Sequence, residues 1–493
     1  MNSTYNNIIL LFALIVLFGC SATKTTTSPQ IIQSHQPPST ISIQSQIDTL
    51  LNNPVLSEAS IGIKIVDLNS SEILYEKNST KLLRPASNLK LITTSAALAL
   101  LKKDFWFKTE VLHDGKITGK TLDGNLYLRG CGDPLVTAES LDSLARMLSK
   151  NINTVTGNLI GDVSYFDDVY WGKGWLWDDE PEAFAAFISP LTMNFNVVKV
   201  YVRPGRKEGD SAVIRVEPLS DQIKIENYAL TSSGGIDSRT DSILNHIIVT
   251  RQANDNTIII AGSISLKSVT REFSLSVKNP EFHSLALFRQ KLESYKVKIY
   301  GDNLIDNTSS SRVIGSINNK LDTVIFEINK RSNNLASENL LKTISSELLL
   351  QRGSSQQSIF LIKKFLSSIE IDTSKFIMMD GSGLSRYNLV SADAFIKLLT
   401  YIYKNKPEYD IIYNSLPVGG IDGTLKNRFT TSSTKGNVRA KTGTYSDAVA
   451  LSGYVNTVSG ATLAFSILVN NFTNNTKEIS KAIDAIVEVL AGY

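Results

Sequence analysis

Apolar and polar positions alternate near the start of the folded chain in a way that predicts two β-strands followed by a buried helix. Ile61, Ile63 and Ile65 are separated by smaller or polar residues, and a second apolar run follows at residues 73–75. Residues 91–101 are rich in leucine and alanine, which is typical of a largely buried helix. We therefore expect the order strand, strand, helix.

The end of the chain shows the same mixture of elements. Strand-like runs separated by turns lie at residues 438–444, 449–455 and 463–469. Helical patterns lie at residues 334–351, 391–403 and 477–490, the last of them clearly amphipathic. The two ends of the chain thus indicate two halves of one mixed domain that contains both helices and strands.

The middle of the chain, between about residues 108 and 320, has a different pattern. Short β-like runs lie at residues 213–216, 247–250, 258–264 and 273–277, a helical pattern at residues 282–292 and a strand-like run at residues 297–300. Structureless connections longer than about 15 residues are uncommon. We therefore predict one or two inserted domains, mostly β.

The N-terminus has the pattern of an export signal. Ile8–Phe18 is an unbroken apolar run, about as long as a signal sequence needs and too short to span a bilayer comfortably. It ends in Leu17-Phe18-Gly19-Cys20, which resembles a lipoprotein signal box whose cysteine receives the lipid, although Phe18 is bulky and no Lys or Arg precedes the run. An ordinary cleaved signal or a short anchor is the alternative.

We accordingly predict a lipoprotein signal peptide at residues 1–20 with lipid on Cys20. Residues 21–46 are rich in Ser, Thr, Gln and Pro and predict a flexible tether. Ser21 in place of aspartate after the cysteine favours the outer membrane. The expected location is the periplasm, with the protein held to that membrane by its lipid.

Charge and cysteine content narrow the function. The chain has 50 Lys and Arg against 47 Asp and Glu, without a basic block, so we predict no nucleic-acid partner. Its two cysteines are Cys20 and Cys131, so no intrachain disulfide is available once Cys20 carries lipid. We interpret Cys131 as structural, and we predict neither a metal site nor a cofactor. The sequence does not specify an oligomeric state.

A Ser-x-x-Lys motif occurs three times, at Ser21–Lys24, Ser87–Lys90 and Ser432–Lys435. Of these, Ser87 begins a strongly apolar helix, where the dipole and free N–H groups can stabilise an oxyanion. A lysine one turn after the serine can take its proton, provided that burial and a nearby cation lower the pKa of the lysine. A capped helix with a surface lysine is the alternative.

A Ser-x-Asn motif fits four places in the chain. We choose Ser332–Asn334 because it lies directly before a predicted helix. The other matches are Ser149–Asn151, Ser316–Asn318 and Ser337–Asn339. Ser332 and Asn334 could equally be no more than a helix cap.

Lys441-Thr442-Gly443-Thr444 occurs once, at the end of a strand-like run. A lysine and hydroxyls on an edge strand can hold a carboxylate. Gly443 leaves room for a peptide to lie alongside, and the Thr444 N–H can complete an oxyanion hole. An exposed lysine at a strand end is the alternative.

The motifs at Ser87, Ser332 and Lys441 occur together in this order, and their surroundings resemble the low-molecular-mass class C penicillin-binding proteins, the D-alanyl-D-alanine carboxypeptidases and endopeptidases. The resemblance covers about residues 55–490 and is carried by residues 84–90, 128–134, 157–204, 329–341, 380–389, 419–429 and 438–455. It implies an α+β fold: a serine penicillin-binding/β-lactamase-like domain, with an antiparallel sheet flanked by helices, interrupted by mostly β nested domains.

The domain limits expected from this resemblance follow the change of pattern along the chain. The catalytic domain comprises residues 47–107 and 321–493, the inserted domain residues 108–198 and 291–320, and the nested domain residues 199–290.

The resemblance implies acyl transfer on peptidoglycan stem peptides. Ser87 would attack the carbonyl between two D-alanines, Lys90 would take its proton, and Ser332 would relay a proton to the departing D-alanine. Asn334 would hydrogen-bond Lys90 and the substrate amide. Lys441, with Thr442 and Thr444, would bind the substrate carboxylate and keep Lys90 neutral. β-Lactams would trap the acyl-enzyme.

The resemblance also implies residues that bind the side chain of the residue before the two D-alanines, which is diaminopimelate. Asp179 would face its amino group, Phe184 would pack nearby, Arg386 would take its carboxylate and Ser446 is a further contact. The alternative is that Asp179 is a solvated turn acid and Arg386 a surface charge.

Two other functions are compatible with the same motifs. A catalytically idle wall-binding lipoprotein would keep the fold without acylating. A β-lactamase would need fast deacylation, and it would release more product than one equivalent of the enzyme.

Overall fold

The computed structural model describes residues 42–233, 246–307 and 311–493. Cys20, the predicted signal peptide and nearly all of the predicted tether lie outside these residues. None of the helices in the described ranges combines the length and the apolarity that a membrane crossing requires.

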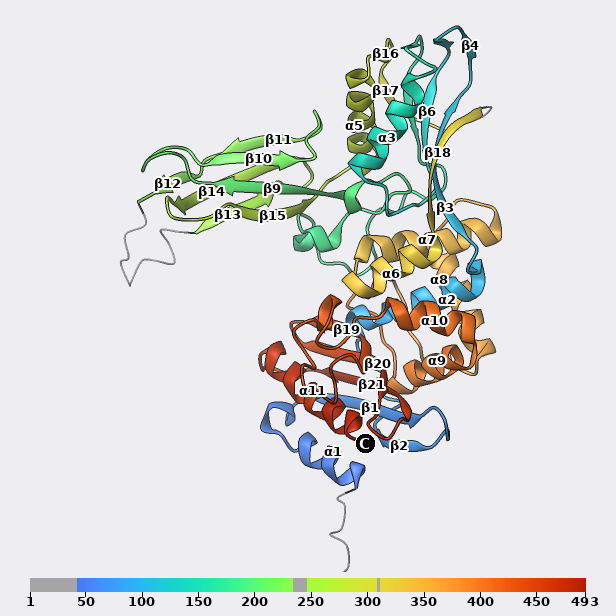
Figure 1. Ribbon diagram of the computed structural model, residues 1–493, viewed down its shortest axis with the longest axis vertical. Helices are drawn as coiled ribbons and strands as arrows, with labels where there is room; N and C mark the ends of the chain where they lie inside the picture. Colours follow the sequence, from blue (N-terminus) through green and yellow to red (C-terminus); the bar gives the residue numbers. More distant parts are fainter. Residues whose placement is uncertain (1–41, 234–245, 308–310) are drawn as a thin grey trace, which may run out of the picture. The chain divides into compact units, whose positions relative to one another are not determined.

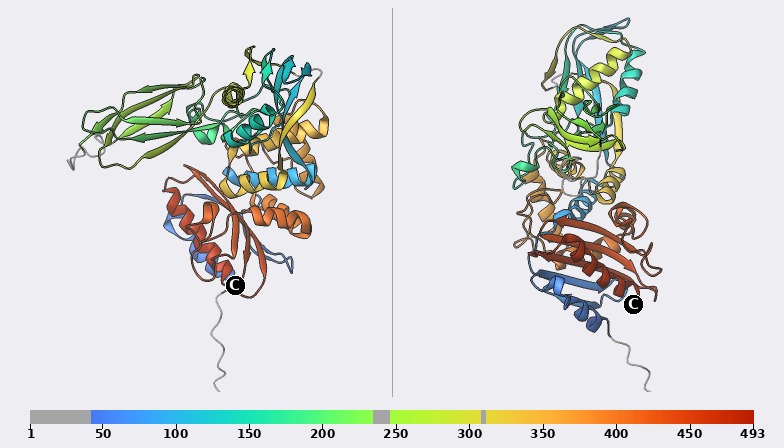
Figure 2. Two further views of the ribbon diagram at one scale, coloured as in Figure 1. Left: turned by 45° about the horizontal axis from the view of Figure 1, so that its top comes forward. Right: turned by 90° about the vertical axis from the view of Figure 1, so that its left-hand side faces the viewer.

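A five-stranded antiparallel sheet, in the order β19-β20-β21-β1-β2, unites the two ends of the chain (Figures 1 and 2). Its strands are β1 (Ser60–Asp67), β2 (Ile73–Lys77), β19 (Val438–Tyr445), β20 (Ala448–Asn456) and β21 (Thr462–Asn470). Strand β1 pairs with β21 over its whole length, from Ser60 opposite Asn470 to Asp67 opposite Leu463. The prediction of one α+β domain built from both ends is confirmed.

Helices cover both faces of this sheet, because its central strands are apolar on both sides. Along β21, Phe465 and Ile467 face one hydrophobic cluster, and Ala464 and Leu468 face the other. Helices α1 (Ile43–Leu51) and α11 (Thr476–Ala491) cover the first face. The second face packs against α2 (Leu89–Leu101), α6 (Leu321–Arg331), α7 (Asn334–Leu349), α8 (Ser355–Ser368), α9 (Ala392–Lys404) and α10 (Lys406–Ser415).

Helix α1 begins at Ile43, so the last residues of the predicted tether, 43–46, are helical. The Ser42 side chain accepts from the Ser45 N–H at its N-terminus, and Ile43, Ile47 and Leu51 are buried at four-residue spacing. That apolar stripe binds the start of the folded chain to the sheet.

The first inserted region contains two sheets, in the orders β17-β8-β6-β3-β18 and β16-β7-β5-β4. Its elements are β3 (Trp106–His113), β4 (Lys116–Thr118), β5 (Thr121–Asp123), β6 (Leu126–Gly130), α3 (Ala138–Ser149), β7 (Thr154–Val155), β8 (Leu159–Asp162), α5 (Pro280–Ser294), β16 (Lys298–Ile299), β17 (Asn303–Ile305) and β18 (Arg312–Lys320). Leu285 and Phe288 of α5 share one hydrophobic cluster with Leu141 of α3 and Leu159 of β8.

A second set of strands lies within this insertion, and the described residues of this nested region form strands and connecting turns. Its sheets have the orders β10-β9-β15 and β11-β14-β12, with β13 paired to β14. The strands are β9 (Val197–Arg203), β10 (Val213–Glu217), β11 (Lys224–Asn227), β12 (Leu230–Ser232), β13 (Ile247–Arg251), β14 (Thr257–Ser265) and β15 (Arg271–Ser276). Because α5 packs with the first inserted region, we propose that the nested region ends before Pro280 rather than at residue 290.

Short 3-10 helices connect several of these elements. They are η1 (Pro54–Leu56), η2 (Ala86–Asn88), η3 (Trp177–Asp179), η4 (Ala183–Ala185), η5 (Asn194–Asn196) and η6 (Gly423–Leu425). Three of them, η2, η3 and η4, carry predicted site residues.

Candidate active site

Ser87 lies in η2, a tight turn that leads directly into α2. Ala86, just before it, has a φ of 45°, a left-handed conformation that costs a non-glycine residue about 1 kcal/mol or more. Asn88 Nδ2 donates to Ser452 Oγ of β20 at 2.8 Å and ties the turn to the sheet. A Cβ on Gly383 would lie 2.0 Å from the Ala86 carbonyl oxygen, so glycine is needed there. Ser87 is thus held at a strained, tightly packed turn.

Lys90 lies one turn beyond Ser87 and is completely buried. Its Nζ lies 3.0 Å from Ser87 Oγ, 2.6 Å from Asn334 Oδ1 and 2.6 Å from the Ser382 carbonyl oxygen. Burial lowers the pKa of Lys90 to about 7, although the nearby Asp380 and Glu338 carboxylates act in the opposite direction. A substantial fraction of Lys90 is therefore neutral near pH 7 and able to accept a proton.

Ser332 and Asn334 flank the sharp turn between α6 and α7. Ser332 has a φ of 62° and ends α6, and Asn334 is the first residue of α7. Neither residue is the N-cap of α7. That cap is Asn333, whose Oδ1 accepts from the Ala336 N–H at 2.9 Å. The side chains of Ser332 and Asn334 instead contact the two lysines, since Lys441 Nζ donates to Ser332 Oγ at 2.9 Å and Asn334 accepts from Lys90.

Lys441 lies in β19, the edge strand beside the Ser87 turn, and it is fully buried rather than exposed at a strand end. Burial, together with repulsion from Lys90, holds the pKa of Lys441 well below its usual value. Two ammonium groups this close disfavour each other, so protonation of one lysine favours the neutral form of the other.

The main chain at Gly443 packs closely against the Ser87 turn. A Cβ on Gly443 would lie 2.4 Å from the Pro85 carbonyl oxygen and 3.1 Å from the Ser87 nitrogen. The missing side chain therefore lets β19 approach the Ser87 turn, and the expected role of Gly443 beside a bound peptide stays a prediction. Thr442 Oγ1 forms a hydrogen bond of 2.8 Å with Thr424 Oγ1, and the Thr444 side chain is exposed.

The predicted side-chain readers lie on separate elements. Asp179 ends η3 and is partly buried, and burial raises its pKa, with Asp178 adding to the rise and Arg386 opposing it. Arg386 is not a free surface charge: its Nη1 donates to Asp447 Oδ1 at 3.0 Å, and its guanidinium stacks on the Tyr445 ring at 4.0 Å.

Phe184 and Ser446 differ in how they relate to the lysine site. Phe184 lies in η4 with its ring half-exposed, and its carbonyl oxygen accepts from Asn334 Nδ2 at 2.7 Å. Ser446 is exposed, just after β19. The main chain at Phe184 is thus hydrogen-bonded to Asn334, which in turn accepts from Lys90.

A profile of the D-Ala-D-Ala carboxypeptidase 3 (S13) family matches residues 43–493. This chain belongs to that family. The resemblance inferred from the motifs is thereby confirmed.

The S13 chain is similar to several characterised proteins over most of its length. It is 33% identical over 477 residues to a D-alanyl-D-alanine carboxypeptidase of Actinomadura sp. strain R39, covering 92% of this chain and 85% of that one. It is 25% identical over 427 residues to the D-alanyl-D-alanine carboxypeptidase DacB of Haemophilus influenzae, covering 85% and 87%. The crystal structure of penicillin binding protein 4 from Haemophilus influenzae has the same fold, with a TM-score of 0.81, 24% identity and coverage of 91% of this chain and 99% of that one.

Two buried carboxylates of this S13 chain were missed from the sequence. The Glu338 carboxylate accepts from the N–H groups of Gly381 and Ser382, at 3.0 and 2.7 Å, and so holds the carbonyl that contacts Lys90. Asp380 accepts from Ser385 N at 2.6 Å and from Trp175 Nε1 at 2.9 Å. Glu338 lies one turn after Asn334 on the same helix, a spacing that could have indicated it.

A cavity of about 460 Å³ adjoins the Ser332 turn. Ser332, Asn333 and Asn334 line it together with Phe184. Lys199 of the nested region also lines it. The space for a ligand beside the turn is therefore bounded by both the catalytic and the inserted regions of the chain.

Proposed function

We propose that this S13 family member is a serine D-alanyl-D-alanine peptidase that cleaves peptidoglycan stem peptides through an acyl-enzyme on Ser87. The observation that carries the proposal is the buried Lys90 amine, 3.0 Å from Ser87 Oγ, with a pKa lowered to about 7. The 33% identical relative named D-alanyl-D-alanine carboxypeptidase supports the reaction class.

In this proposal neutral Lys90 takes the proton of Ser87 Oγ as the oxygen attacks the D-alanyl carbonyl carbon. The N–H groups of Ser87 and Thr444 stabilise the oxyanion, and the close approach of Gly443 to the Ser87 nitrogen supports this pairing. The C–N bond then breaks as Ser332 relays the proton held by Lys90 to the leaving amine, which returns Lys90 to its neutral form. Water hydrolyses the ester and regenerates Ser87, whereas a β-lactam leaves the ester in place.

Lys441 binds the C-terminal carboxylate, with Thr442 and Thr444 beside it. A carboxylate favours the protonated form of Lys441, and that cation favours neutral Lys90. Substrate binding therefore places the proton on Lys441 and leaves Lys90 neutral. The hydrogen bond from Lys441 Nζ to Ser332 Oγ supports a relay between them.

Specificity for diaminopimelate is assigned to the four predicted side-chain readers, Asp179, Phe184, Arg386 and Ser446. Asp179 faces the side-chain ammonium, Phe184 packs nearby, Arg386 binds the carboxylate and Ser446 is a further contact. The electrostatic interaction between Arg386 and Asp179 supports their being neighbours. Because Arg386 already pairs with Asp447, its guanidinium would donate both to Asp447 and to the diaminopimelate carboxylate.

The proposed location is the periplasm, with lipid on Cys20 holding the enzyme to the outer membrane. The apolar run that ends at Cys20 supports export, and a substrate in the cell wall requires it.

A fluorescent penicillin tests the nucleophile. Ser87→Ala should abolish covalent labelling while the thermal melt of the protein is retained, and Ser432→Ala, the matched change at another Ser-x-x-Lys motif, should label normally. Labelling that survives in Ser87→Ala would identify another serine. Labelling absent from the wild type would favour an idle wall-binding protein.

Mass spectrometry of products from purified muropeptides identifies the bond that is cut. Loss of one D-alanine from uncross-linked pentapeptides reports carboxypeptidase activity, and conversion of cross-linked dimers to monomers reports endopeptidase activity. Turnover of nitrocefin beyond one equivalent would instead indicate a β-lactamase.

A further inference from the structure

The segment that follows Asp179 is fastened to the nested β region by a buried arginine. Arg251, the last residue of β13, donates from Nη2 to the Glu180 carbonyl oxygen at 2.9 Å and to Glu180 Oε1 at 3.3 Å. Its Nε donates to the Ser276 carbonyl oxygen at 3.0 Å. One guanidinium thus joins two strand ends of the nested region to the residue next to Asp179.

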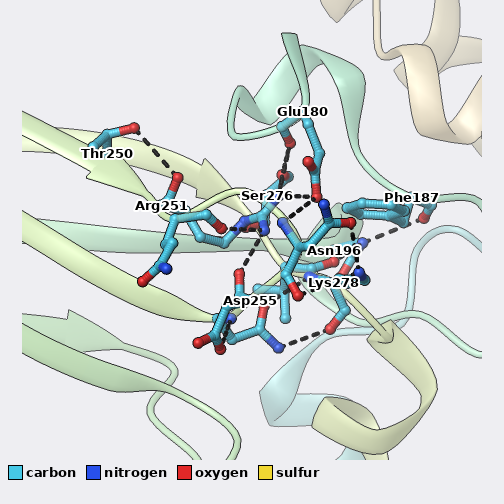
Figure 3. Close-up of polar contacts among 12 residues, drawn as sticks. Glu180, Phe187, Asn196, Thr250, Arg251, Asp255, Ser276 and Lys278 are labelled. Carbon is cyan, nitrogen blue, oxygen red and sulfur yellow. Dashed lines mark hydrogen bonds and ion pairs between the residues drawn. The ribbon is translucent and has the colours of Figure 1, made fainter. Parts of the chain in front are cut away.

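Ser276, the last residue of β15, reinforces this attachment. Its Oγ donates to the same Glu180 carbonyl oxygen at 2.6 Å, and its N–H donates to the Pro181 carbonyl oxygen at 3.0 Å. Glu182 then forms an antiparallel bridge with Leu275. The segment therefore lies alongside the end of β15, joined to it by a single β-bridge, and Figure 3 shows Glu180 on its loop facing Arg251 and Ser276.

The burial of Arg251 makes the attachment specific. The residue is 2% exposed, and its Nη1 donates to the carbonyl oxygens of Gln252 and Asp255, at 3.2 and 2.6 Å. A buried guanidinium is costly unless its donors are matched. With Glu180 displaced, Nη2 would lose its two acceptors on that residue, so the segment is strongly favoured in this one position.

The opposite end of the same segment contacts the lysine site. The Phe184 carbonyl oxygen accepts from Asn334 Nδ2, and Asn334 in turn accepts from Lys90. Residues 179–184 are therefore held between the nested region and the catalytic turn. A segment fixed at both ends keeps Asp179 in one place relative to Ser87.

We propose that the nested β region positions the substrate-reading segment, with Arg251 and Ser276 fixing the main chain at Glu180 so that Asp179 meets the ammonium group of the stem-peptide side chain. This inference rests on the proposed reading role of Asp179. Arg251 and Ser276 touch no substrate, and they act as positioning residues. The nested region thereby contributes to substrate selection while lying outside the reacting groups.

A purely structural role for Arg251 would predict different behaviour. If Arg251 only stabilised the nested region, its replacement would lower stability and affect all acyl donors alike. If it acts through Asp179, its effect should be confined to donors with a side-chain ammonium, and it should vanish once Asp179 is changed. Non-additivity in a double-mutant cycle measures this coupling.

The experiment compares two synthetic pentapeptides and benzylpenicillin. One peptide carries meso-diaminopimelate at the third position, and the other carries an apolar residue of similar length without the ammonium. Arg251→Lys and Ser276→Ala are measured alone and combined with Asp179→Asn. Arg215→Lys is the matched control, since Arg215 pairs with Glu217 and stacks on Tyr201 within the nested region.

Arg251→Lys should lower kcat/KM for the diaminopimelate peptide by about 5–30-fold, the effect of losing an oriented charge-assisted contact. The apolar peptide and benzylpenicillin acylation should change by less than about twofold, as should every substrate with Arg215→Lys. In the Asp179→Asn background, Arg251→Lys should have no further effect. Ser276→Ala gives the same pattern with a smaller loss, and it decides the matter if Arg251→Lys does not fold.

The contrary outcomes are distinct. Equal losses for all three acyl donors, or additive losses in the double variant, would overturn the positioning role while leaving the proposed function intact. If Asp179→Asn itself left the preference between the two peptides unchanged, the reading role of Asp179 would fail, and this inference would fail with it. If benzylpenicillin acylated none of the proteins, the proposed function would be wrong.

Discussion

At the scale of single residues, the site contains two buried lysines, each with its own small set of polar partners. Lys90 contacts Ser87 and Asn334, and Lys441 contacts Ser332. Burial favours the neutral form of both amines, and the charge of Lys90 further disfavours protonation of Lys441. In the proposed mechanism the substrate carboxylate places the proton on Lys441, so that Lys90 acts as the base in the complex with substrate.

The pH dependence of acylation should report the protonation of Lys90. Acylation by penicillin should rise as pH increases through about 7, because protonated Lys90 cannot accept the Ser87 proton. Lys441→Ala removes a neighbouring positive charge, so the pKa of Lys90 should rise and the midpoint should move to higher pH. Stopped-flow acylation constants across pH measure the shift. The maximal rate should fall by about 30–150-fold through loss of the carboxylate contact, worth about 2–3 kcal/mol. An unchanged midpoint would show that Lys441 does not influence Lys90.

Glu338→Gln should move the same midpoint in the opposite direction. The Glu338 carboxylate favours the protonated form of Lys90, so its removal should lower the pKa of Lys90 and the midpoint of acylation. Glutamine keeps one acceptor for the Gly381 and Ser382 N–H groups, so the turn should survive with reduced stability. The comparison uses the same stopped-flow profile together with a thermal melt. A midpoint that moved upward would contradict the assigned electrostatics.

At the scale of elements, the turn between α6 and α7 shows where sequence reasoning reached its limit. The sequence identified Ser332 and Asn334 but could not separate catalysis from helix capping, because serine and asparagine suit both roles. In the structure Asn333 is the cap, which leaves its two neighbours free to contact the lysines. Spacing alone cannot reveal this, since it depends on the left-handed φ at Ser332.

Because Asn333 caps the helix and its two neighbours contact the lysines, substitutions at these adjacent positions should have different effects. Asn333→Ala should destabilise the protein by about 1 kcal/mol, the usual loss for a helix cap, and should slow acylation far less than its neighbours do. Ser332→Ala or Asn334→Ala should slow acylation strongly with little change in stability. Chemical denaturation and penicillin labelling rates separate the effects. Loss of stability in Asn334→Ala with none in Asn333→Ala would reverse the assignment of the cap.

Helix α6 is an element that the periodicity did not predict. It contains Val324, Ile325 and Ile328, whose β-branched side chains favour strands in isolation. All three are buried in the helical layer above the main sheet, and that tertiary packing overrides local propensity. The strands β10, β13, β14 and β15, by contrast, contain short β-like runs and lie where the pattern predicted them.

At the scale of the whole molecule, the sequence predicted that the two distant ends are halves of one mixed domain, and the pairing of β1 with β21 confirms it by joining both ends in one sheet. The three motifs come from both ends of the chain and must meet in one active site, which requires the two ends to fold together. The packing of α5 with the first inserted region and the pairing of Arg386 with Asp447 were not predictable. An amphipathic helix or a lone charge does not specify its partner, and only the folded chain does.

The attachment to a membrane is the last prediction, and the two cysteines provide a matched pair. Cys20→Ala should release the protein from membranes into the soluble periplasmic fraction and abolish incorporation of radiolabelled palmitate. Cys131→Ala should leave both unchanged, because Cys131 lies in the folded part of the chain, where burial raises the pKa of its thiol and makes it unreactive. Both variants should still react with fluorescent penicillin, since Ser87 and its lysines lie in the folded domain. A single acyl chain binds membranes only weakly, whereas a lipoprotein carries several, so the expected change is from nearly complete to nearly absent membrane association. Membrane association that persists in Cys20→Ala, with the apolar run of residues 8–18 still on the protein, would instead establish an uncleaved anchor.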